Sequence, residues 1–375
     1  MLITTAGTIK LKGVAAALAA FGLLLLSGCS GRAAQQDRPH HTGHGFKNIH
    51  QTENSKFGDF LKWRWQRLWK NIPTPSAYDF PVASNDPEFL RSNRTVTTLT
   101  WIGHATVLLQ LDGQNILTDP HFSKRASPVS WAGPKRVVPP GLSLEELPLI
   151  DLVLISHDHY DALDDTTIKA LFRREGGERT MFFVPLGLKD WFRRRGIDRV
   201  IELDWWQNRF HHGLEVVAVP VQHWSKRSPF ARNQTLWAGW VVRSTNFSFF
   251  FAGDSGYTAH FKEIGQKYGP FDLAAIPIGA YEPRWFMKKH HMNPEEAVMV
   301  HQDVLARKSV AIHWGTFILT DEPLDEPPRA LAKSLQDQGI GADQFLVLKH
   351  GETIMEWTRD HSSSNPAQSL RPSTQ

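Results

Sequence analysis

Apolar residues along the chain form short runs that predict an antiparallel sheet first and a mixed α/β pattern afterwards. Segments 98–102, 106–111 and 115–118 have the composition of strands, and Asp112 with Gly113 predicts a hairpin turn between the last two. From residue 149 onward, apolar runs alternate with segments of helical spacing. Further strands are expected at 152–155, 180–184, 200–203, 214–221, 236–243, 247–252, 273–277, 310–313 and 344–348.

Helices are expected between these strands, at 166–174, 188–194 and 294–307. The last has a marked start, with Asn293 as N-cap, Pro294 at the first helical position and Glu296 three residues after the cap. No short-period repeat or linker interrupts 96–358, which predicts one domain there. Strand-rich halves separated by helices fit an α/β fold of the four-layer α/β/β/α sandwich type.

The N-terminus has a different pattern. Lys10 and Lys12 precede a short apolar segment and the sequence Leu26-Ser27-Gly28-Cys29, which is similar to a bacterial lipobox. We therefore expect residues 1–28 to be a lipoprotein signal peptide and the Cys29 thiol to be lipidated. An uncleaved membrane anchor is the alternative. Ser30 after the cysteine favours the bacterial cell envelope, at the periplasmic face of the outer membrane.

Residues 29–95 are expected to form a lipid-anchored tether followed by an amphipathic aromatic and basic segment. The four histidines between residues 30 and 55 are interpreted as part of a solvated linker, with weak metal binding as the alternative. Residues 57–70 place aromatic and apolar side chains at helical spacing with basic residues between them. This suits a membrane interface, or a helix that packs on the core with a basic outer face. A disordered tail is expected at 359–375.

Composition narrows the function classes. The chain has 375 residues, 41% of them hydrophobic, which is ample for a large core. Its formal charge of +4 falls to +2 when Lys10 and Lys12 leave with the signal peptide, so a nucleic-acid partner is not expected. Cys29 is the only cysteine, which excludes an internal disulfide, cysteine metal ligands and a cysteine nucleophile.

Candidate metal ligands follow the apolar strands. His157, His159 and Asp161 come directly after the predicted strand that ends at Ile155. Neutral imidazoles and carboxylates are the ligands that Zn²⁺ and related divalent ions prefer. Polar side chains at strand ends are also where layered α/β proteins commonly keep their chemistry.

Three more strands end in such a residue, namely His223, Asp254 and His313. Because strands of a sheet bring their ends together, residues far apart in the sequence can share one site. We expect one tetrahedral site and a second site beside it. The first is built from His157, His159, His223 and Asp254, and the second from Asp161, Asp254 and His313.

This set of residues resembles the metallo-β-lactamase fold superfamily. Within it, longer motifs are similar to the N-acyl-phosphatidylethanolamine-hydrolysing phospholipase D family, over residues 97 to 351. The motifs lie at 100–106, 117–120, 123–128, 133–136, 184–187, 202–206, 250–257, 276–287 and 311–317.

The resemblance implies two zinc ions, with Asp254 between them. It also shows one departure, because the family pattern has a histidine directly after Asp161, where this chain has Ala162. The second ion is therefore expected to be held more weakly or completed differently, by water or with help from Asp164 or Tyr160.

The resemblance further implies a zinc-dependent phosphodiesterase of the phospholipase D type that acts on N-acylphosphatidylethanolamine or related phospholipids and releases phosphatidic acid and the head-group alcohol. Asp161 and Asp254 are the expected catalytic carboxylates, and His291 matches a position that faces substrate. His104 and Asp119 are expected to orient the metal ligands. Two alternatives stay open: a lactonase-like metal hydrolase of a soluble substrate, and a catalytically impaired lipoprotein that only binds lipid.

Overall fold

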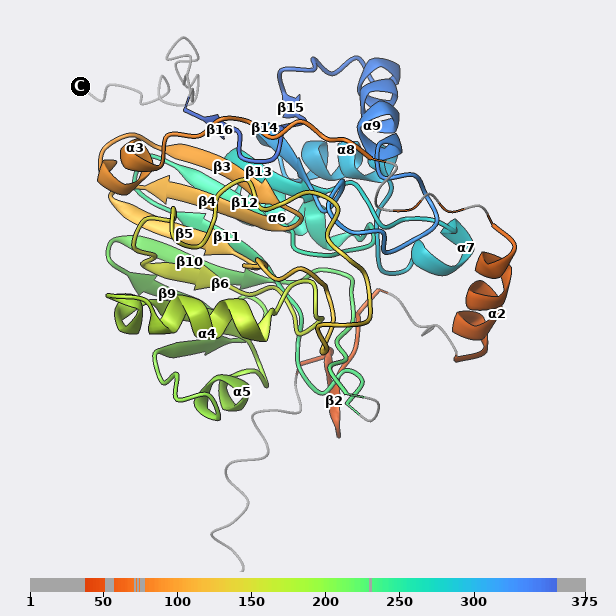
Figure 1. The fold of residues 1–375 in the computed structure, drawn as a ribbon, viewed down its shortest axis with the longest axis horizontal. Coiled ribbons are helices and arrows are strands. Elements are labelled where there is room, and N and C mark those ends of the chain that lie inside the picture. The colour runs from red at the N-terminus through yellow and green to blue at the C-terminus, as the bar shows by residue number, and fades with distance from the viewer. Residues whose placement is uncertain are drawn as a thin grey trace, which may run out of the picture.

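The structure, a computed structural model, describes residues 38–50, 57–70, 72, 74, 78–228 and 231–355. The predicted signal peptide, Cys29 and the predicted tail at 359–375 lie outside the described residues. Within the described part, two seven-stranded sheets are stacked and carry helices on their outer faces (Figure 1), which confirms the predicted α/β/β/α sandwich.

The first sheet has the strand order β16-β3-β4-β5-β6-β7-β8. Its pairs are antiparallel from β16 to β5 and parallel from β5 to β8. The parallel strands β5, β6 and β7 therefore end at the same edge. The strands are β3 (Thr98–Gly103), β4 (Thr106–Leu111), β5 (Gln114–Thr118), β6 (Leu152–Leu154), β7 (Met181–Pro185), β8 (Val200–Leu203) and β16 (Thr353–Ile354).

The second sheet has the order β15-β14-β13-β12-β11-β10-β9 and the same division, with antiparallel pairs from β9 to β12 and parallel pairs from β12 to β15. Each sheet thus has an antiparallel half and a parallel half. The strands are β9 (Asn208–His211), β10 (Leu214–Val219), β11 (Gly239–Arg243), β12 (Ser248–Phe251), β13 (Phe271–Pro277), β14 (Ala306–Ile312) and β15 (Phe345–Leu346).

Alternation along the strands divides the core into two parts. In β4, Val107 and Leu109 pack in the larger cluster between the sheets, whereas Leu108 faces the other way into a cluster beneath the helices. Successive side chains of a strand point to opposite faces, so a strand buried on both faces supplies both clusters. This accounts for the nearly continuous apolar runs in the sequence.

Helices cover the outer faces of the sheets. Ile168 and Leu171 of α4 (Asp165–Arg173) and Phe192 of α5 (Lys189–Arg193) pack on the outer face of the first sheet, and α6 (His260–Tyr268), α8 (Pro294–Asp303) and α9 (Glu326–Asp337) belong to the second half of the chain. Figure 1 shows α4 and α5 at one end of the stack and α8 and α9 at the opposite end.

Helix α8 begins as predicted but is shorter. Asn293 accepts a hydrogen bond from the Glu296 amide, and the Glu296 side chain accepts one from the Asn293 amide, which forms the capping box. The prediction that the helix continues to residue 307 is wrong. Leu305 has a φ of 57°, which ends the helical path, and residues 306 and 307 already belong to β14.

Segments before residue 96 pack on this body. Residues 41–46 form a small hairpin of β1 (His41–Thr42) and β2 (Gly45–Phe46). The His40 and His41 Nε2 atoms lie 2.6 and 2.8 Å from the two Asp204 carboxylate oxygens, and His40 is buried against Trp205. The interpretation of these two histidines as parts of a solvated linker is therefore wrong. Leu90 of α3 (Pro87–Ser92) is buried in the cluster on the outer face of the first sheet.

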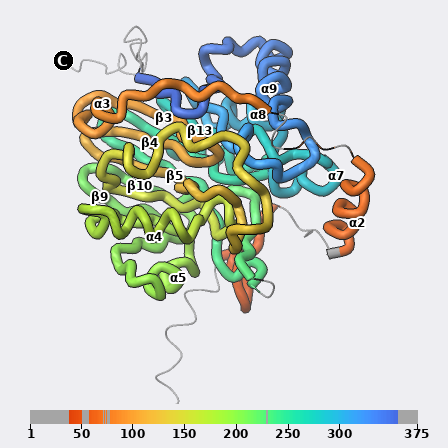
Figure 2. Tube along the Cα trace, viewed as in Figure 1, coloured from red at the N-terminus to blue at the C-terminus, as the bar shows by residue number. Residues whose placement is uncertain are grey.

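Helix α2 (Phe57–Leu68) stands at the edge of the molecule beside α7 (Arg284–Met287), as the tube in Figure 2 also shows. Among the side chains of α2 that the structure describes, Trp63 is the buried one; it stacks on Phe286 and donates a hydrogen bond of 3.0 Å to Asp321. Arg67 adds a hydrogen bond of 3.2 Å to the Leu319 carbonyl oxygen. The large apolar side chains Phe60, Leu61, Trp65, Leu68 and Trp69 are exposed.

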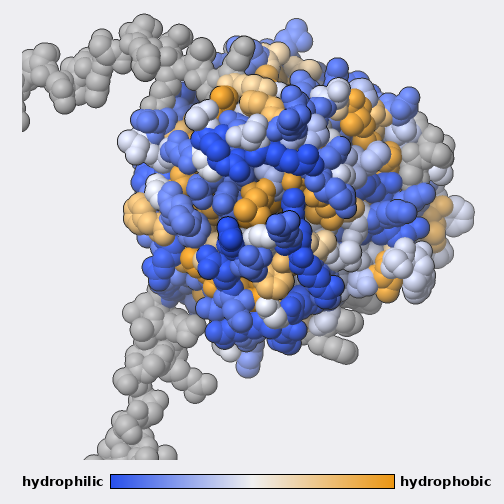
Figure 3. Space-filling model, turned by 60° about the vertical axis from the view of Figure 1, so that its left-hand side comes forward, coloured by the Kyte–Doolittle hydropathy of each residue, from blue (hydrophilic) through white to orange (hydrophobic). Residues whose placement is uncertain are grey.

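The surface is mixed in polarity. Figure 3 shows apolar residues as small patches among hydrophilic ones on the face that it presents. None of the helices in the described residues has the length and apolar character needed to cross a bilayer.

Candidate metal centre

The loop that leaves β6 carries the first ligands, and a buried carboxylate holds it. Asp119, at the end of β5, accepts hydrogen bonds from the Ser156 amide (2.7 Å) and from the Ser156 hydroxyl. The same hydroxyl lies 2.8 Å from His157 Nδ1. Asp119 thus orients His157 through Ser156, and burial raises the pKa of Asp119 well above its usual value. Ser156 was not singled out from the sequence.

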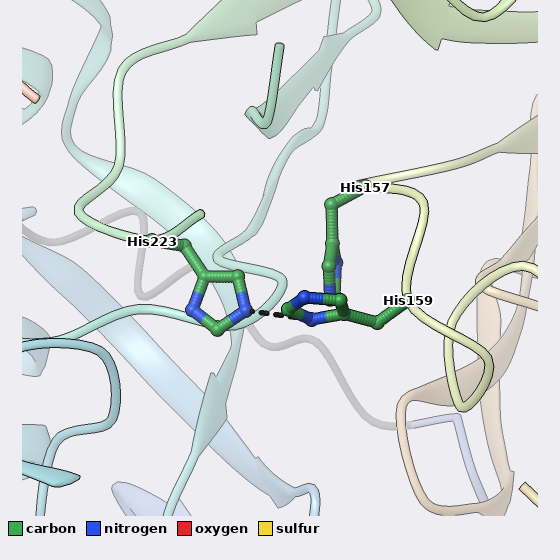
Figure 4. A group of neighbouring side chains, drawn as sticks. All are labelled: His157, His159 and His223. Atoms are coloured by element: carbon green, nitrogen blue, oxygen red, sulfur yellow. Dashed lines mark hydrogen bonds between the residues drawn. The ribbon is translucent and has the colours of Figure 1, made fainter. Parts of the chain in front are cut away.

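His157, His159 and His223 form a compact group. Each offers one ring nitrogen, and these three atoms lie within 4.8 Å of one another. In Figure 4 the His223 and His159 rings approach each other with His157 beside them, and the dashed line marks the 3.2 Å contact between His223 Nε2 and His159 Nδ1. His223 Nδ1 donates to the His290 carbonyl oxygen at 2.9 Å, so its Nε2 lone pair faces the group.

Asp254 lies between this group and a second one. Its Oδ2 is 3.7 Å from His157 Nε2 and 4.0 Å from His223 Nε2, while its Oδ1 is 3.0 Å from His313 Nε2. The two carboxylate oxygens thus face different histidines, which is the arrangement expected of a bridging ligand. Gly253 has a φ of 59°, and a Cβ there would lie 2.6 Å from the Ser156 Cβ, so the loops after β12 and β6 are in close contact.

The second group contains Asp161, His313 and His104, which offer ligand atoms within 4.8 Å of one another. Asp161 Oδ2 is 3.2 Å from His104 Nε2 and 3.5 Å from His313 Nε2. The rings of His104 and His313 have centroids 4.1 Å apart. His104 was expected only to orient the ligands, yet it lies as close to Asp161 as His313 does.

Two residues considered for completing the second group are engaged elsewhere. Asp164 caps α4, accepting hydrogen bonds from the Thr166 amide and from the Thr167 hydroxyl. Tyr160 donates its hydroxyl hydrogen to the Arg227 carbonyl oxygen at 2.6 Å. Among the described residues, Asp164 belongs to none of the groups of histidine and carboxylate ligand atoms.

His291 lies beside both groups. Together with His223 and Asp254 it forms another set of ligand atoms within 4.8 Å, and its ring centroid is 5.6 Å from that of His313. Its amide donates to the Met287 carbonyl oxygen at 2.9 Å, so the turn after α7 directs it into the site. Burial lowers the pKa of His291 to about 3, and the ring is therefore neutral at physiological pH.

The metal-free site contains both neutral histidines and charged groups. Burial lowers the pKa of His159 to about 3 and that of His157 well below its usual value, so these imidazoles are neutral. Burial disfavours charge on His313 as well, but Asp254 and Asp161 outweigh it and raise its pKa to about 10. Burial is likewise outweighed at Asp161 and Asp254, where neighbouring histidines hold the carboxyl pKa values well below their usual range.

These residues fit a divalent metal ion. Within the described residues, His157 Nε2 and His159 Nε2 are buried ring nitrogens that make no hydrogen bond. Buried polar atoms are nearly always paired, so two unpaired nitrogens in one group of ligand residues indicate a missing partner. Neutral imidazoles together with ionised carboxylates are the donor set of zinc-type sites.

A pocket of about 640 Å³ opens over the two groups. His159, Asp161, Asp254 and His291 lie at its base, and α2 contributes Phe60 and Trp63 to its wall. Lys226 and Arg232 supply basic groups. The remaining lining is largely apolar, and consists of Ala126, Pro134, Tyr160, Trp224, Ala280, Phe286, Met287, His290, Leu319 and Thr320. The contribution of α2 to the pocket wall was not predicted from the sequence, because it depends on contacts between residues more than 200 positions apart in the chain.

Comparison with known proteins gives consistent results. A family model described as a β-lactamase superfamily domain matches residues 114–314. The chain is 45% identical over 265 residues to N-acyl-phosphatidylethanolamine-hydrolyzing phospholipase D 1 of Caenorhabditis elegans, a match that covers 68% of this chain and 74% of that protein. It is 35% identical over 264 residues to the mitochondrial N-acyl-phosphatidylethanolamine-hydrolyzing phospholipase D of Saccharomyces cerevisiae, covering 68% of this chain and 55% of the yeast protein.

Among solved structures, Igni18, a metallo hydrolase from the archaeon Ignicoccus hospitalis, has a similar fold. The TM-score is 0.53 at 22% identity, and the likeness covers 69% of this chain and 98% of that one. At this identity the likeness concerns the fold alone.

Proposed function

The chain is a metal-dependent hydrolase that belongs to the β-lactamase superfamily and, within it, to the family of the N-acyl-phosphatidylethanolamine-hydrolysing phospholipases D, and from this premise we propose that it hydrolyses a phospholipid. The proposed reaction is phospholipase D-type cleavage of N-acylphosphatidylethanolamine or a related lipid to phosphatidic acid and the head-group alcohol. The observation that carries the proposal is the pocket, which joins the histidine and carboxylate groups to a largely apolar wall.

The pocket offers what a phospholipid needs. Its apolar residues suit acyl chains, because they bury hydrocarbon that would otherwise contact water. Lys226 and Arg232 provide positive charge for a phosphate group. The Lys226 amide donates a hydrogen bond of 2.8 Å to Asp158, which ties this part of the wall to the loop that carries His157 and His159.

We propose zinc as the metal. His157, His159 and His223 would hold one ion, Asp161 and His313 would contribute to a second, and Asp254 would lie between the two. Ions bound there would acidify a water molecule and offset the charge of the phosphate oxygens. Asp161 and Asp254 are ionised, so they would help to hold these ions, and the neutral His291 ring would contact the substrate phosphate.

A lipid assay with purified protein tests the function. Wild type, loaded with zinc, should release N-acylethanolamine from vesicles that contain N-acylphosphatidylethanolamine. His157→Ala should lose at least a hundredfold in rate, because an essential ligand is missing. His301→Ala is a matched control, since His301 is also buried but bonds Ser309 Oγ at 2.8 Å, outside the site.

The alternatives predict other outcomes of the same assay. A lactonase-like enzyme would open a lactone and leave the vesicles intact. A protein that only binds lipid would release nothing, and His157→Ala would match wild type. Either result would contradict the proposal.

We also propose that α2 brings the pocket to a membrane. Its exposed Trp65 and Leu68, with Trp69 directly after the helix, are accompanied by Lys62 and Arg64, and an amphipathic helix with aromatic and basic residues suits an anionic bilayer surface. Phe60 and Trp63 of the same helix line the pocket, so lipid could pass from the surface to the site along one element.

Lipidation of Cys29 and location at the periplasmic face of the outer membrane complete the proposal, supported by the sequence around Leu26-Ser27-Gly28-Cys29. Membrane fractions of cells that produce the protein should contain a form whose mass includes acyl chains on Cys29. A Cys29→Ala variant should lack that mass, and an unmodified wild-type chain would contradict the assignment.

A further inference from the structure

The group around Asp161 lacks the imidazole that the sequence pattern leads one to expect, since Ala162 occupies that position and is buried. A different imidazole lies there. His104 comes from the turn between β3 and β4, almost 60 positions earlier in the chain, and its Nε2 is 3.2 Å from Asp161 Oδ2. It is 2% exposed, and it offers a ring nitrogen within 4.8 Å of ligand atoms on Asp161 and His313.

The backbone holds His104 in this place from three sides. Its amide donates to the Thr316 hydroxyl at 2.8 Å, and its carbonyl oxygen accepts from the Trp101 indole and from the His313 amide, each at 2.9 Å. Its φ of 54° is unusual for a residue with a side chain, which marks a conformation imposed by these contacts. Because His313 is one of the anchors, the two imidazoles keep a fixed spacing.

Other residues that could supply the missing ligand are excluded by their own contacts. Asp164 caps α4, and Tyr160 donates to a carbonyl oxygen. His121 is also buried nearby, but its Nδ1 accepts a hydrogen bond from Arg136 at 3.0 Å, so its Nε2 carries the hydrogen and has no free lone pair. Among the described residues, His104 is the imidazole that clusters with both Asp161 and His313.

We propose that His104 is a protein ligand of the second metal ion, together with Asp161, His313 and the bridging Asp254, and that it supplies the imidazole that Ala162 cannot. The second site is then complete in protein ligands despite the missing histidine.

The competing role for His104 is that of a hydrogen-bond donor that only orients Asp161. His104→Gln makes the distinction. A glutamine amide can still donate to Asp161, but it is a poor ligand for zinc. If His104 orients Asp161, the glutamine variant should keep most of the metal affinity, whereas if His104 is a ligand the second ion should be lost.

The test measures bound metal and needs no substrate, so it is independent of the phospholipase assay. Full-length protein is stripped with a chelator, reloaded with zinc or cobalt, and analysed by elemental mass spectrometry, calorimetry and the visible spectrum of bound Co²⁺. Wild type should bind two ions per chain. His104→Gln should retain the first ion with affinity within about threefold and bind the second at least a hundredfold more weakly, beyond the range of a residue that only orients a ligand.

A second variant tests whether the loss of the second ion is due to misfolding. Ala162→His restores an imidazole after Asp161, and when it is combined with His104→Gln it should recover the second ion. Circular dichroism and thermal melting check that each variant is folded. Two results overturn the proposal: a single ion in the wild type, or a folded His104→Gln variant that binds both ions with wild-type affinity.

Discussion

Two residues that are not themselves candidate metal ligands, Ser156 and Gly253, determine where the candidate ligands lie. Ser156 connects Asp119 to His157, and Gly253 lets the loop that carries Asp254 approach that serine. His157, His159, His223, Asp254 and His313 were selected from the sequence because each follows an apolar run, and the structure brings them together. Ser156 was missed, since a serine carries no metal signal. His104 was expected to orient the ligands, but its proximity to both Asp161 and His313 depends on tertiary contacts and could not be predicted.

Gly253→Ala tests the importance of this close contact. The new Cβ would lie 2.6 Å from the Ser156 Cβ at a backbone φ of 59°. We expect a loss of about 2 to 4 kcal/mol of unfolding free energy and at least a tenfold loss of metal affinity, because both loops must move. Urea denaturation and metal titration measure the two effects.

Gly196→Ala is the matched control for that variant. Gly196 also has a positive φ, of 76°, but no atom lies within 4 Å of its added Cβ. It should cost about 1 kcal/mol through backbone strain alone and leave metal affinity unchanged. Equal effects of the two substitutions would show that crowding against Ser156 is unimportant.

At the scale of elements, alternation and strand ends were predictable and long-range packing was not. The strands β3 to β8 and β10 to β14 lie close to their predicted positions because each is a short apolar run between turn residues. The hairpin of β1 and β2 was missed, since it depends on His40 and His41 reaching Asp204, more than 160 positions away. Similarly, α2 was expected as a helix, but its place on the pocket wall depends on Phe286 and Asp321.

Membrane contact by α2 is tested by replacing its exposed aromatic residues. Trp65 and Trp69 are 64% and 77% exposed. In a Cys29→Ser background, which removes the site of the proposed lipid anchor, Trp65→Ser with Trp69→Ser should weaken binding to anionic vesicles about tenfold or more, because two indole rings would no longer enter the interface. Activity on vesicles should fall, while activity on a soluble short-chain substrate should stay.

Phe210→Ser is the control for general surface effects. Phe210 lies on β9, away from the pocket lining, and is 73% exposed. Its replacement should leave vesicle binding as in the parent protein. If the α2 double variant also sediments with vesicles as well as its parent, α2 does not contact the membrane.

For the whole molecule, buried neutral histidines make stability depend on pH. Burial lowers the pKa of His121 to about 4 and that of His350 to about 3, against 6.5 for the free side chain. Below pH 6.5, these histidines therefore bind protons in the unfolded chain but not in the folded chain. Their contribution to stability is complete above pH 6.5 and is lost as the pH falls toward 4 and 3.

Metal-free protein should accordingly be less stable at pH 5 than at pH 7. Each such histidine changes the unfolding free energy by up to about 1.4 kcal/mol per pH unit below 6.5, so a loss of a few kcal/mol is expected. His350→Gln should make the pH dependence shallower, as measured by urea denaturation in the presence of a chelator. An unchanged slope would mean that His350 is protonated in the folded protein.

The arrangement of ligands on loops from both sheets has a mechanical consequence. His159 follows a strand of the first sheet and His223 a strand of the second, 64 positions later, so one ion bound to both is a cross-link that closes a long loop. A covalent cross-link over such a loop stabilises a protein by about 4 kcal/mol. In a chain whose single cysteine excludes an internal disulfide, a metal ion bound to both histidines would provide such a cross-link. Chelation should therefore lower the melting temperature of the wild type by several degrees, and the difference between chelated and metal-loaded protein should be smaller for His157→Ala, which lacks a ligand of this ion.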